Sequence, residues 1–279
     1  MGVAVVVRIL FLCLSFAALT DAVAGPLPRV ASLNLCTDQL LLSIAEPAQI
    51  ASLSWLSADP AESLQAGRAS QYPLNYGTAE EILSLSPDVV LGSEYSSTFA
   101  RALLQDLGLK VVVIDPATSV ADIERNVITI AEAVDQPGRG QHIVAQMKDQ
   151  LREIQTRRSA ELGTAIVIRP GGFTISQGSL AENLIQLAGL SNLAAAGGLD
   201  EWGSLPLETL LVHQPEWLIL TGYRSTQSSL ANAFLDHPVL RRQTSGTTQT
   251  ITVDGAYWSC GQPASLDSVG LLLDALGKR

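Results

Sequence analysis

The chain has 279 residues, of which 47% are hydrophobic and 16% are charged, and its formal net charge is -10. A chain of this length and hydrophobicity can bury a large core, and two lobes of ordinary size are the natural expectation. The acidic balance, without a cluster of Lys or Arg, argues against nucleic acid and anionic membrane surfaces as partners.

The first 24 residues differ in character from everything that follows. A short segment with one positive charge, Arg8, precedes an apolar run at 9–19, and Ala22-Val23-Ala24 offers small residues for cleavage. This is the layout of a secretory signal peptide, so we expect cleavage after Ala24 and export of the chain. An uncleaved membrane anchor is the alternative. No later segment is long and apolar enough to span a bilayer.

Strand and helix patterns alternate along the first part of the chain. Apolar runs rich in β-branched residues predict strands at 29–33, 50–54, 88–92 and 110–115, with helical patterns at 37–44 and 78–85. The alternation then pauses for two helical segments, 119–134 and roughly 139–161, separated by Gln136-Pro137-Gly138. Strands resume at 165–169, 216–222 and 248–254. Capping boxes are predicted for Thr78 with Glu81 and for Ser179 with Glu182.

This order predicts an α/β fold with two Rossmann-like lobes, each a parallel sheet, joined by one long backbone helix. The predicted parts are a signal peptide at 1–24, an N-terminal lobe at 25–136, a linking helix at 137–162 and a C-terminal lobe at 163–279. One continuous doubly wound sheet is the alternative.

An internal repeat supports two lobes. Residues 79–91 and 207–219 each contain a Glu early in a helix, an apolar helix face, and a Pro-acidic pair that leads into an apolar strand. The proline closes the helix because it has no amide donor. Glu80 and Glu208 therefore occupy equivalent positions, one in each lobe. A favourable interaction with the helix dipole explains either carboxylate without any partner.

Together with residues 29–33, 107–114 and 187–192, these motifs resemble the metal-chelate substrate-binding proteins of ABC importers, which carry ferric siderophores, heme or cobalamin. The resemblance implies a periplasmic protein that clamps its ligand between two lobes. It also implies docking onto the permease dimer through one Glu per lobe, here Glu80 and Glu208. The sequence departs from the family at Asp38-Gln39, where a Glu often follows the Thr, and at Cys260. We expect a monomer without a cofactor.

In open α/β sheets, ligands bind beyond the carboxyl ends of the strands. Aromatic side chains gather at these positions and suit a large flat or apolar ligand. Arg169 and Arg224 are candidates for binding carboxylates of the ligand, or else lie in solvent as surface arginines. The expected ligand-binding residues are Cys36, Trp55, Tyr76, Glu94, Tyr95, Arg169, Phe173, Trp202, Tyr223, Arg224, Tyr257, Trp258 and Cys260.

Two cysteines remain after removal of the signal peptide, and the expected compartment is oxidising. Cys36 and Cys260 follow strands in different lobes. Three alternatives stay open: an interlobe disulfide, a pair of soft metal ligands, or two unpaired buried thiols.

The sequence therefore predicts a binding protein for a metal chelate, with a ferric siderophore or cobalamin preferred over heme, and not an enzyme. A secreted thiol-dependent enzyme, or a binder of a thiol-coordinated metal complex at Cys36 and Cys260, is the alternative. The chain has no Gly-x-Ser-x-Gly, Walker or dinucleotide glycine pattern. Its three histidines, His142, His213 and His237, are too few and too scattered to predict a bare zinc or manganese site.

Overall fold

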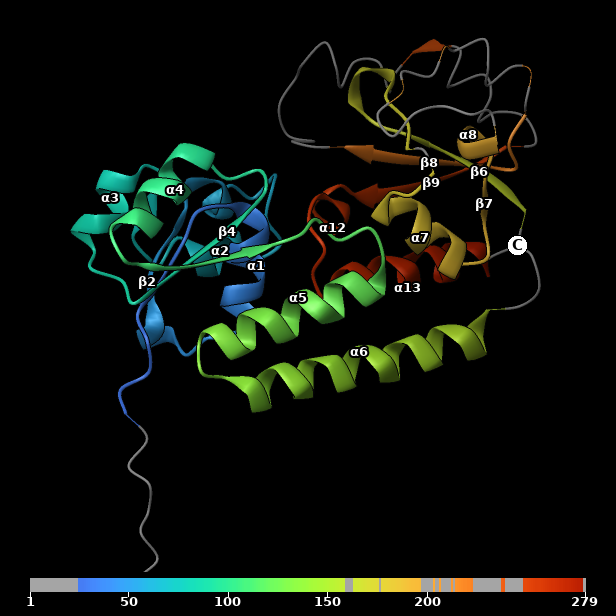
Figure 1. The fold of residues 1–279 in the computed structure, drawn as a ribbon. Coiled ribbons are helices and arrows are strands. Elements are labelled where there is room, and N and C mark those ends of the chain that lie inside the picture. The colour runs from blue at the N-terminus through green and yellow to red at the C-terminus, as the bar shows by residue number, and fades with distance from the viewer. Residues whose placement is uncertain are drawn as a thin grey trace, which may run out of the picture.

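The computed structural model describes residues 25–158, 163–175, 177–196, 214–222 and 248–277, together with Gly203, Pro206, Val212, His237 and Pro238. The predicted signal peptide at 1–24 lies outside these residues. Figure 1 shows two α/β lobes side by side, with two long helices beneath them. Within the described ranges, no helix is long and apolar enough to cross a membrane.

The N-terminal lobe contains a sheet of five parallel strands in the order β3-β2-β1-β4-β5. The strands are β1 (Val30–Ser32), β2 (Ile50–Ser54), β3 (Leu74–Asn75), β4 (Val89–Ser93) and β5 (Lys110–Ile114). The four strands predicted here are confirmed. The two residues of β3 are too few to show a strand periodicity, so the sequence does not predict this strand.

Helices cover both faces of this sheet. Ala31 and Val90 pack on one face with α3 (Ala79–Ser84) and α4 (Thr98–Asp106). Val30 packs on the other face, which is covered by α1 (Leu35–Ile44) and α5 (Val120–Ala133). Short helical turns complete the lobe: η1 (Pro47–Gln49), η2 (Trp55–Ala58) and α2 (Ala66–Ala69).

The described part of the C-terminal lobe contains a second parallel sheet, in the order β7-β6-β8-β9. Its strands are β6 (Thr164–Ile168), β7 (Ser191–Asn192), β8 (Trp217–Gly222) and β9 (Gln249–Asp254). Its helical segments are η3 (Pro170–Gly172), α7 (Leu180–Leu187), α8 (Leu193–Ala196), α12 (Ala256–Ser259) and α13 (Ser265–Leu276). Two separate sheets rule out one continuous sheet, and the predicted two-lobe α/β fold is confirmed.

The internal repeat has a structural counterpart at the start of β4 and β8. The Asp88 carboxylate accepts a hydrogen bond from the backbone N of Arg29, at 2.7 Å, just before β1. The Glu216 carboxylate accepts one from the backbone N of Thr164, at 3.3 Å, where β6 begins. Each Pro-acidic pair thus ties the repeated strand to the first strand of its own sheet.

The lobes are linked by more than the predicted helix. The segment 115–119 leaves β5 and reaches the C-terminal lobe, where Asn183 of α7 accepts a hydrogen bond from the backbone N of Val120 at 3.3 Å. Helix α5 then runs back beneath α1, and α6 (Pro137–Arg157) crosses once more beside it (Figure 1). The chain therefore passes between the lobes three times. The division at residues 136 and 162 stays a prediction.

A tight contact holds the two linking helices together. A Cβ atom at Gly140 would lie 2.4 Å from the Cβ of Ala131, so α5 and α6 approach more closely than any larger residue at 140 would allow. One apolar cluster runs through this joint, from Leu41 of α1 through Ile130 and Met147 to Leu184 and Leu272 of the C-terminal lobe. The two lobes therefore share a core.

Candidate ligand cleft

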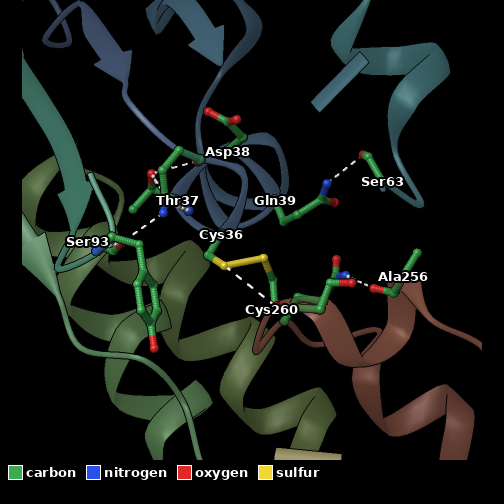
Figure 2. Close-up of a disulfide and its surroundings, with 12 residues drawn as sticks. Cys36, Thr37, Asp38, Gln39, Ser63, Ser93, Ala256 and Cys260 are labelled. Atoms are coloured by element: carbon green, nitrogen blue, oxygen red, sulfur yellow. Dashed lines mark hydrogen bonds between the residues drawn. A yellow bond between two sulfur atoms is a disulfide. The ribbon is translucent and has the colours of Figure 1, made fainter. Parts of the chain in front are cut away.

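A disulfide bond between Cys36 and Cys260 joins the two lobes. Cys36 lies in the first turn of α1, directly after β1, and Cys260 follows α12, which comes directly after β9. The two Cα atoms are 5.0 Å apart (Figure 2). The disulfide alternative is confirmed, and the alternative of two unpaired thiols is wrong. The alternatives of thiolate metal ligands and of a thiol nucleophile are wrong as well, because a disulfide sulfur carries no thiolate charge.

The disulfide forms part of the wall of a cavity of about 440 Å³ that lies between the lobes. The N-terminal lobe contributes Cys36, Ser93, Tyr95 and Ile114, and the crossing segment and α5 contribute Asp115, Pro116, Ala117, Thr118 and Asn126. The C-terminal lobe contributes Arg169, Ile175, Ser179, Leu180, Ala181, Thr221, Trp258, Ser259, Cys260 and Gly261. Most of this lining is apolar, with a few polar groups spread among three parts of the chain.

The N-terminal wall is organised around the start of α1. The Asn34 side chain caps this helix by accepting a hydrogen bond from the backbone N of Thr37 at 3.0 Å. The same side chain donates to the Ser93 hydroxyl at 2.6 Å, at the end of β4. Ser93 in turn accepts from the backbone N of Tyr95 at 3.2 Å. These contacts fix the carboxyl ends of β1 and β4 relative to the disulfide.

The C-terminal wall presents a cationic and an aromatic side chain. Arg169 follows β6 and is partly buried; burial lowers the pKa of its guanidinium, which stays protonated at neutral pH. Trp258 of α12 donates from its indole N to the Ser268 hydroxyl at 2.9 Å, which anchors the ring against α13. A partly desolvated guanidinium and an indole that line the same cavity can together hold an anionic group attached to an apolar body.

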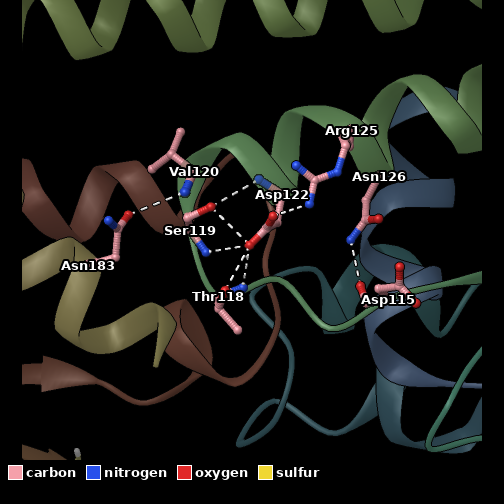
Figure 3. Close-up of polar contacts among 8 residues, drawn as sticks. All are labelled: Asp115, Thr118, Ser119, Val120, Asp122, Arg125, Asn126 and Asn183. Atoms are coloured by element: carbon pink, nitrogen blue, oxygen red, sulfur yellow. Dashed lines mark hydrogen bonds and ion pairs between the residues drawn. The ribbon is translucent and has the colours of Figure 1, made fainter. Parts of the chain in front are cut away.

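The crossing segment forms the third wall, and Figure 3 shows the polar contacts that hold it. The Asp122 carboxylate accepts hydrogen bonds from the backbone N atoms of Thr118 and Ser119, each at 2.9 Å, and also pairs with Arg125. Burial by itself would raise the pKa of Asp122, but these hydrogen bonds outweigh it and hold the pKa at about 2. Asn126 donates to the carbonyl O of Asp115 at 2.8 Å. The segment is therefore held rigidly where it meets the cavity.

Asp38, at the departure from the family pattern, points into the N-terminal lobe and does not line the cavity. It is fully buried and accepts hydrogen bonds from the backbone N of Ser54, at 3.2 Å, and from the Ser54 hydroxyl. Burial raises its pKa to about 7, although hydrogen bonds from Ser32 and Ser54 act in the opposite direction. Gln39 is also buried and donates to Ser63 at 2.5 Å (Figure 2).

The structure brings five of the predicted ligand residues to the cavity: Cys36, Tyr95, Arg169, Trp258 and Cys260. The other described ones do not line it. Trp55 and Tyr76 stack on each other with ring centroids 6.2 Å apart, and 42% and 72% of their surfaces are exposed. Glu94 and Phe173 are exposed, and Tyr257 is partly buried, with its pKa raised by burial and by Asp267 and Asp254. Trp202, Tyr223 and Arg224 lie outside the described residues.

Sequence reasoning missed the crossing segment as a part of the site. Asp115 to Thr118 follow β5 and therefore obey the strand-end rule, which could have found them. Ser93 is the last residue of β4 and Thr221 is the last but one of β8, so both obey it as well. By contrast, Asn126, Ser179 and Leu180 lie within or just before helices, and only the packing of α5 and α7 brings them to the cavity.

A model of the family described as periplasmic binding protein matches residues 30–256 of the chain. The chain belongs to the periplasmic binding protein family. This confirms the family resemblance, and it confirms the prediction of a binding protein and not an enzyme.

One curated relative of this periplasmic binding protein is the uncharacterized ABC transporter substrate-binding lipoprotein YvrC of Bacillus subtilis (strain 168). The two are 25% identical over 152 residues, which cover 51% of this chain and 48% of the relative. The match thus spans about half the length of that relative.

Solved structures show the same fold at lower identity. The periplasmic heme-binding protein RhuT from Roseiflexus sp. RS-1 superposes with a TM-score of 0.71 at 21% identity, covering 89% of this chain and 98% of RhuT. The periplasmic vitamin B12 binding protein BtuF of Vibrio cholerae superposes with a TM-score of 0.66 at 18% identity, covering 91% of this chain and 99% of BtuF.

Proposed function

We propose that this periplasmic binding protein is the substrate-binding component of an ABC importer, acts in the periplasm, and carries a metal chelate that bears a carboxylate. The printed descriptions of its relatives support the proposal, since they name an ABC transporter component, a heme-binding protein and a vitamin B12 binding protein.

The observation that carries the proposal is that Arg169 and Trp258 line the same interlobe cavity. The cavity volume of about 440 Å³ falls within the range of sites for organic ligands. Ile114, Ile175 and Leu180 add apolar surface, which suits a bulky organic ligand better than a small hydrated ion. Arg169 supplies the cationic partner for a carboxylate of that ligand.

The three candidate chelates make different demands on Tyr95. A ferric siderophore or cobalamin arrives with its metal already enclosed by its own donor atoms. Heme iron has open axial positions, and a tyrosine phenolate is one of the side chains that bind there. Tyr95 lines the cavity and is largely exposed to it or to solvent. The Soret absorption band of bound hemin responds to the axial ligand of the iron. We therefore expect Tyr95→Phe to shift this band if heme is the cargo.

The direct test is a titration of tryptophan fluorescence with hemin, cyanocobalamin, cobinamide and a panel of ferric siderophores. Saturable one-to-one quenching by one member, with dissociation constants in the micromolar range or below, supports the proposal and names the chelate. Free tryptophan serves as the control for light absorbed by the ligand. Failure of every member to bind would show that the metal-chelate class is wrong.

Delivery to the importer requires a docking surface, and we propose that Glu80 and Glu208 provide its two anchors. Glu80 lies exposed in the first turn of α3, whose start is fixed by the capping box of Thr78 and Glu81. The Glu81 carboxylate accepts from the backbone N atoms of Thr78, at 3.3 Å, and Tyr76, at 3.0 Å. Glu208 lies outside the described residues; the internal repeat makes it equivalent to Glu80, and the docking role proposed for both comes from the family resemblance.

A further inference from the structure

We propose that the Cys36–Cys260 disulfide is a positioning element of the ligand site, which fixes the separation of the two cavity walls so that the oxidised chain binds cargo more tightly than the reduced chain. This inference rests on the proposed binding function and adds a residue pair that controls it. The disulfide acts through the walls that it holds and needs no bond to the ligand.

The first argument is the place of the bond. Its two residues are separated by 224 positions in the sequence, and both line the cavity. Cys36 lies two residues after Asn34, which fixes Ser93 and through it Tyr95. Cys260 lies two residues after Trp258. The disulfide therefore couples the Tyr95 wall of one lobe directly to the Trp258 wall of the other.

The second argument is the rigidity of the C-terminal attachment. Cys260 is only 3% exposed, and its carbonyl O accepts a hydrogen bond from the Ser265 hydroxyl at 3.2 Å. A Cβ atom at the next residue, Gly261, would lie 2.3 Å from the Cβ of Ala117 in the crossing segment. The backbone around Cys260 is thus wedged between α13 and the third wall, and it cannot shift without moving both.

The third argument concerns the number of joints between the lobes. The crossing segment, α5 and α6 connect the lobes through the polypeptide (Figure 1), and the disulfide adds a covalent connection at the cavity wall (Figure 2). A covalent link at the cavity wall, added to the joint formed by the polypeptide, further restricts rotation of one lobe against the other. Reduction leaves only the joint formed by the polypeptide, so a smaller fraction of molecules has both walls at the binding distance. Apparent affinity falls in proportion to that fraction.

The test compares the oxidised chain with the chain reduced by a trialkylphosphine. In this reaction the S–S bond breaks and both sulfurs become thiols, while the phosphine is oxidised by two electrons and takes its oxygen from water. Near-UV circular dichroism checks that the reduced chain remains folded. Small-angle X-ray scattering then measures the breadth of the interlobe distances, and fluorescence titration with hemin and cyanocobalamin measures affinity.

We expect reduction to broaden the distance distribution and to weaken binding of whichever probe binds by about tenfold or more. The double variant Cys36→Ser, Cys260→Ser should bind the probe as weakly as the reduced chain does. Reoxidation should restore tight binding in the unmodified chain and have no effect on the double variant. Ile82→Ala is the matched control, because it removes buried side-chain volume from the α3–α4 face of the sheet and leaves the disulfide intact. It should lower the melting temperature without changing affinity.

A disulfide that merely stabilises the fold gives a different result. Reduction would then lower the melting temperature, as Ile82→Ala does, but would leave the scattering and the affinity unchanged, and the proposal would be wrong. If neither hemin nor cyanocobalamin binds the oxidised chain, the proposal that this protein carries them fails. The scattering comparison alone then decides the inference about the disulfide. Equal distance distributions in the two redox states overturn it.

Discussion

Two carboxylates near the cleft, Asp38 and Asp122, experience opposite electrostatic environments. Asp38 is enclosed in the N-terminal lobe, where burial raises its pKa to about 7. Asp122 caps α5 and is surrounded by backbone and hydroxyl donors that hold its pKa at about 2. The first group is easier to protonate in the folded chain than in the unfolded chain, and the second is harder. They therefore make opposite contributions to the pH dependence of stability.

Asp38→Asn should flatten the dependence of the unfolding free energy on pH. The Asp38 pKa is raised on folding, so its favourable contribution is complete below about pH 4 and is lost as the pH rises through about 7. A shift of about three pKa units corresponds to about 4 kcal/mol as an upper figure. Urea unfolding at about pH 4.5 and about pH 8 measures the difference between the unmodified chain and the variant.

Asp122→Asn is the control for this measurement. The contribution of Asp122 to the unfolding free energy is complete above about pH 4 and disappears only as the pH falls through about 2. Asp122→Asn should therefore lower the unfolding free energy by the same amount at both pH values of the test. If the unfolding free energy of Asp38→Asn changed with pH as much as that of the unmodified chain, the assignment of a raised pKa to Asp38 would be contradicted.

Arg169 is the residue on which the proposed cargo chemistry depends most directly. Arg169→Gln removes the cationic partner of the carboxylate, and we expect the dissociation constant of the cargo to rise by about 10- to 100-fold, the cost of one charge-assisted hydrogen bond. Arg169→Lys should recover part of the loss, because it keeps the charge but not the planar fork. Isothermal titration calorimetry with the chelate found in the panel provides the measurement.

The matched control is Arg152→Gln, on α6, where the side chain pairs with Asp149 in solvent. Its affinity should equal that of the unmodified chain. Equal affinity of Arg169→Gln as well would remove Arg169 from the site and with it the argument for a carboxylate on the cargo.

At the scale of elements, the starts of the helices show how local chemistry and tertiary contacts combine. The predicted capping box of Thr78 and Glu81 is present in full. At α7, Ser179 caps the helix as predicted, but the Glu182 carboxylate accepts from the backbone N of Gly178, at 2.7 Å, one residue before the cap. An unpredicted box of Ser119 and Asp122 begins α5 at the point where the chain has just reached the second lobe.

Gly261 lines the cavity, and we expect a larger residue at this position to destabilise the protein. Gly261→Ala places a Cβ atom 2.3 Å from that of Ala117, so either the loop after Cys260 or the crossing segment must move. Overpacking of this kind costs about 1–3 kcal/mol of stability, and it should also weaken cargo binding because both segments line the cavity. Thermal unfolding and fluorescence titration measure the two effects.

Gly67→Ala, in α2, is the corresponding control, since no atom lies within 4 Å of the added Cβ. We expect this variant to match the unmodified chain in affinity and to be equal or slightly higher in stability. A Gly261→Ala variant that also behaves in this way would show that the contact with Ala117 does not constrain the cleft.

The elements that the sequence predicted are those whose signal is local. Long β-branched runs such as 110–115 and helical patterns such as 119–134 were found, whereas the two-residue strands β3 and β7 carry too little pattern to detect, and helices α4 and α13 were not predicted. Asp38 gave no sign of being buried, because a carboxylate in the first turn of a helix is ordinarily exposed. The Cys36–Cys260 pair spans 224 positions, so its bonding depends on how the lobes pack. Trp55 and Tyr76 follow strands as the cavity residues do, but they stack on each other outside the cavity.

At the scale of the whole molecule, the chain is built to resist large movements of its lobes. One apolar core runs through both lobes and the two linking helices, and the chain passes between the lobes three times. The disulfide closes a loop so long that, in the chain-entropy view, it contributes up to about 5 kcal/mol of stability. Small movements within such a frame fit the proposed role of a carrier that presents the same docking surface to an importer each time cargo is bound.

The proposed docking surface can be separated from the cargo site by charge reversal. Glu80→Arg combined with Glu208→Arg should abolish uptake of cargo by cells that carry the variant as their sole copy, while cargo affinity in solution stays unchanged. The reason is that exposed charges at an interface fix orientation and association, whereas the cavity is lined by other residues. Uptake is measured with labelled chelate, and affinity is measured by titration of the purified variant.

Glu132→Arg combined with Glu153→Arg is the matched control, because it makes the same change in net charge at exposed positions of α5 and α6. This variant should support normal uptake. Normal uptake by the Glu80–Glu208 variant would show that the repeat carboxylates are no more than helix-start residues. Loss of uptake together with loss of affinity would place the defect in the cargo site instead of the docking surface.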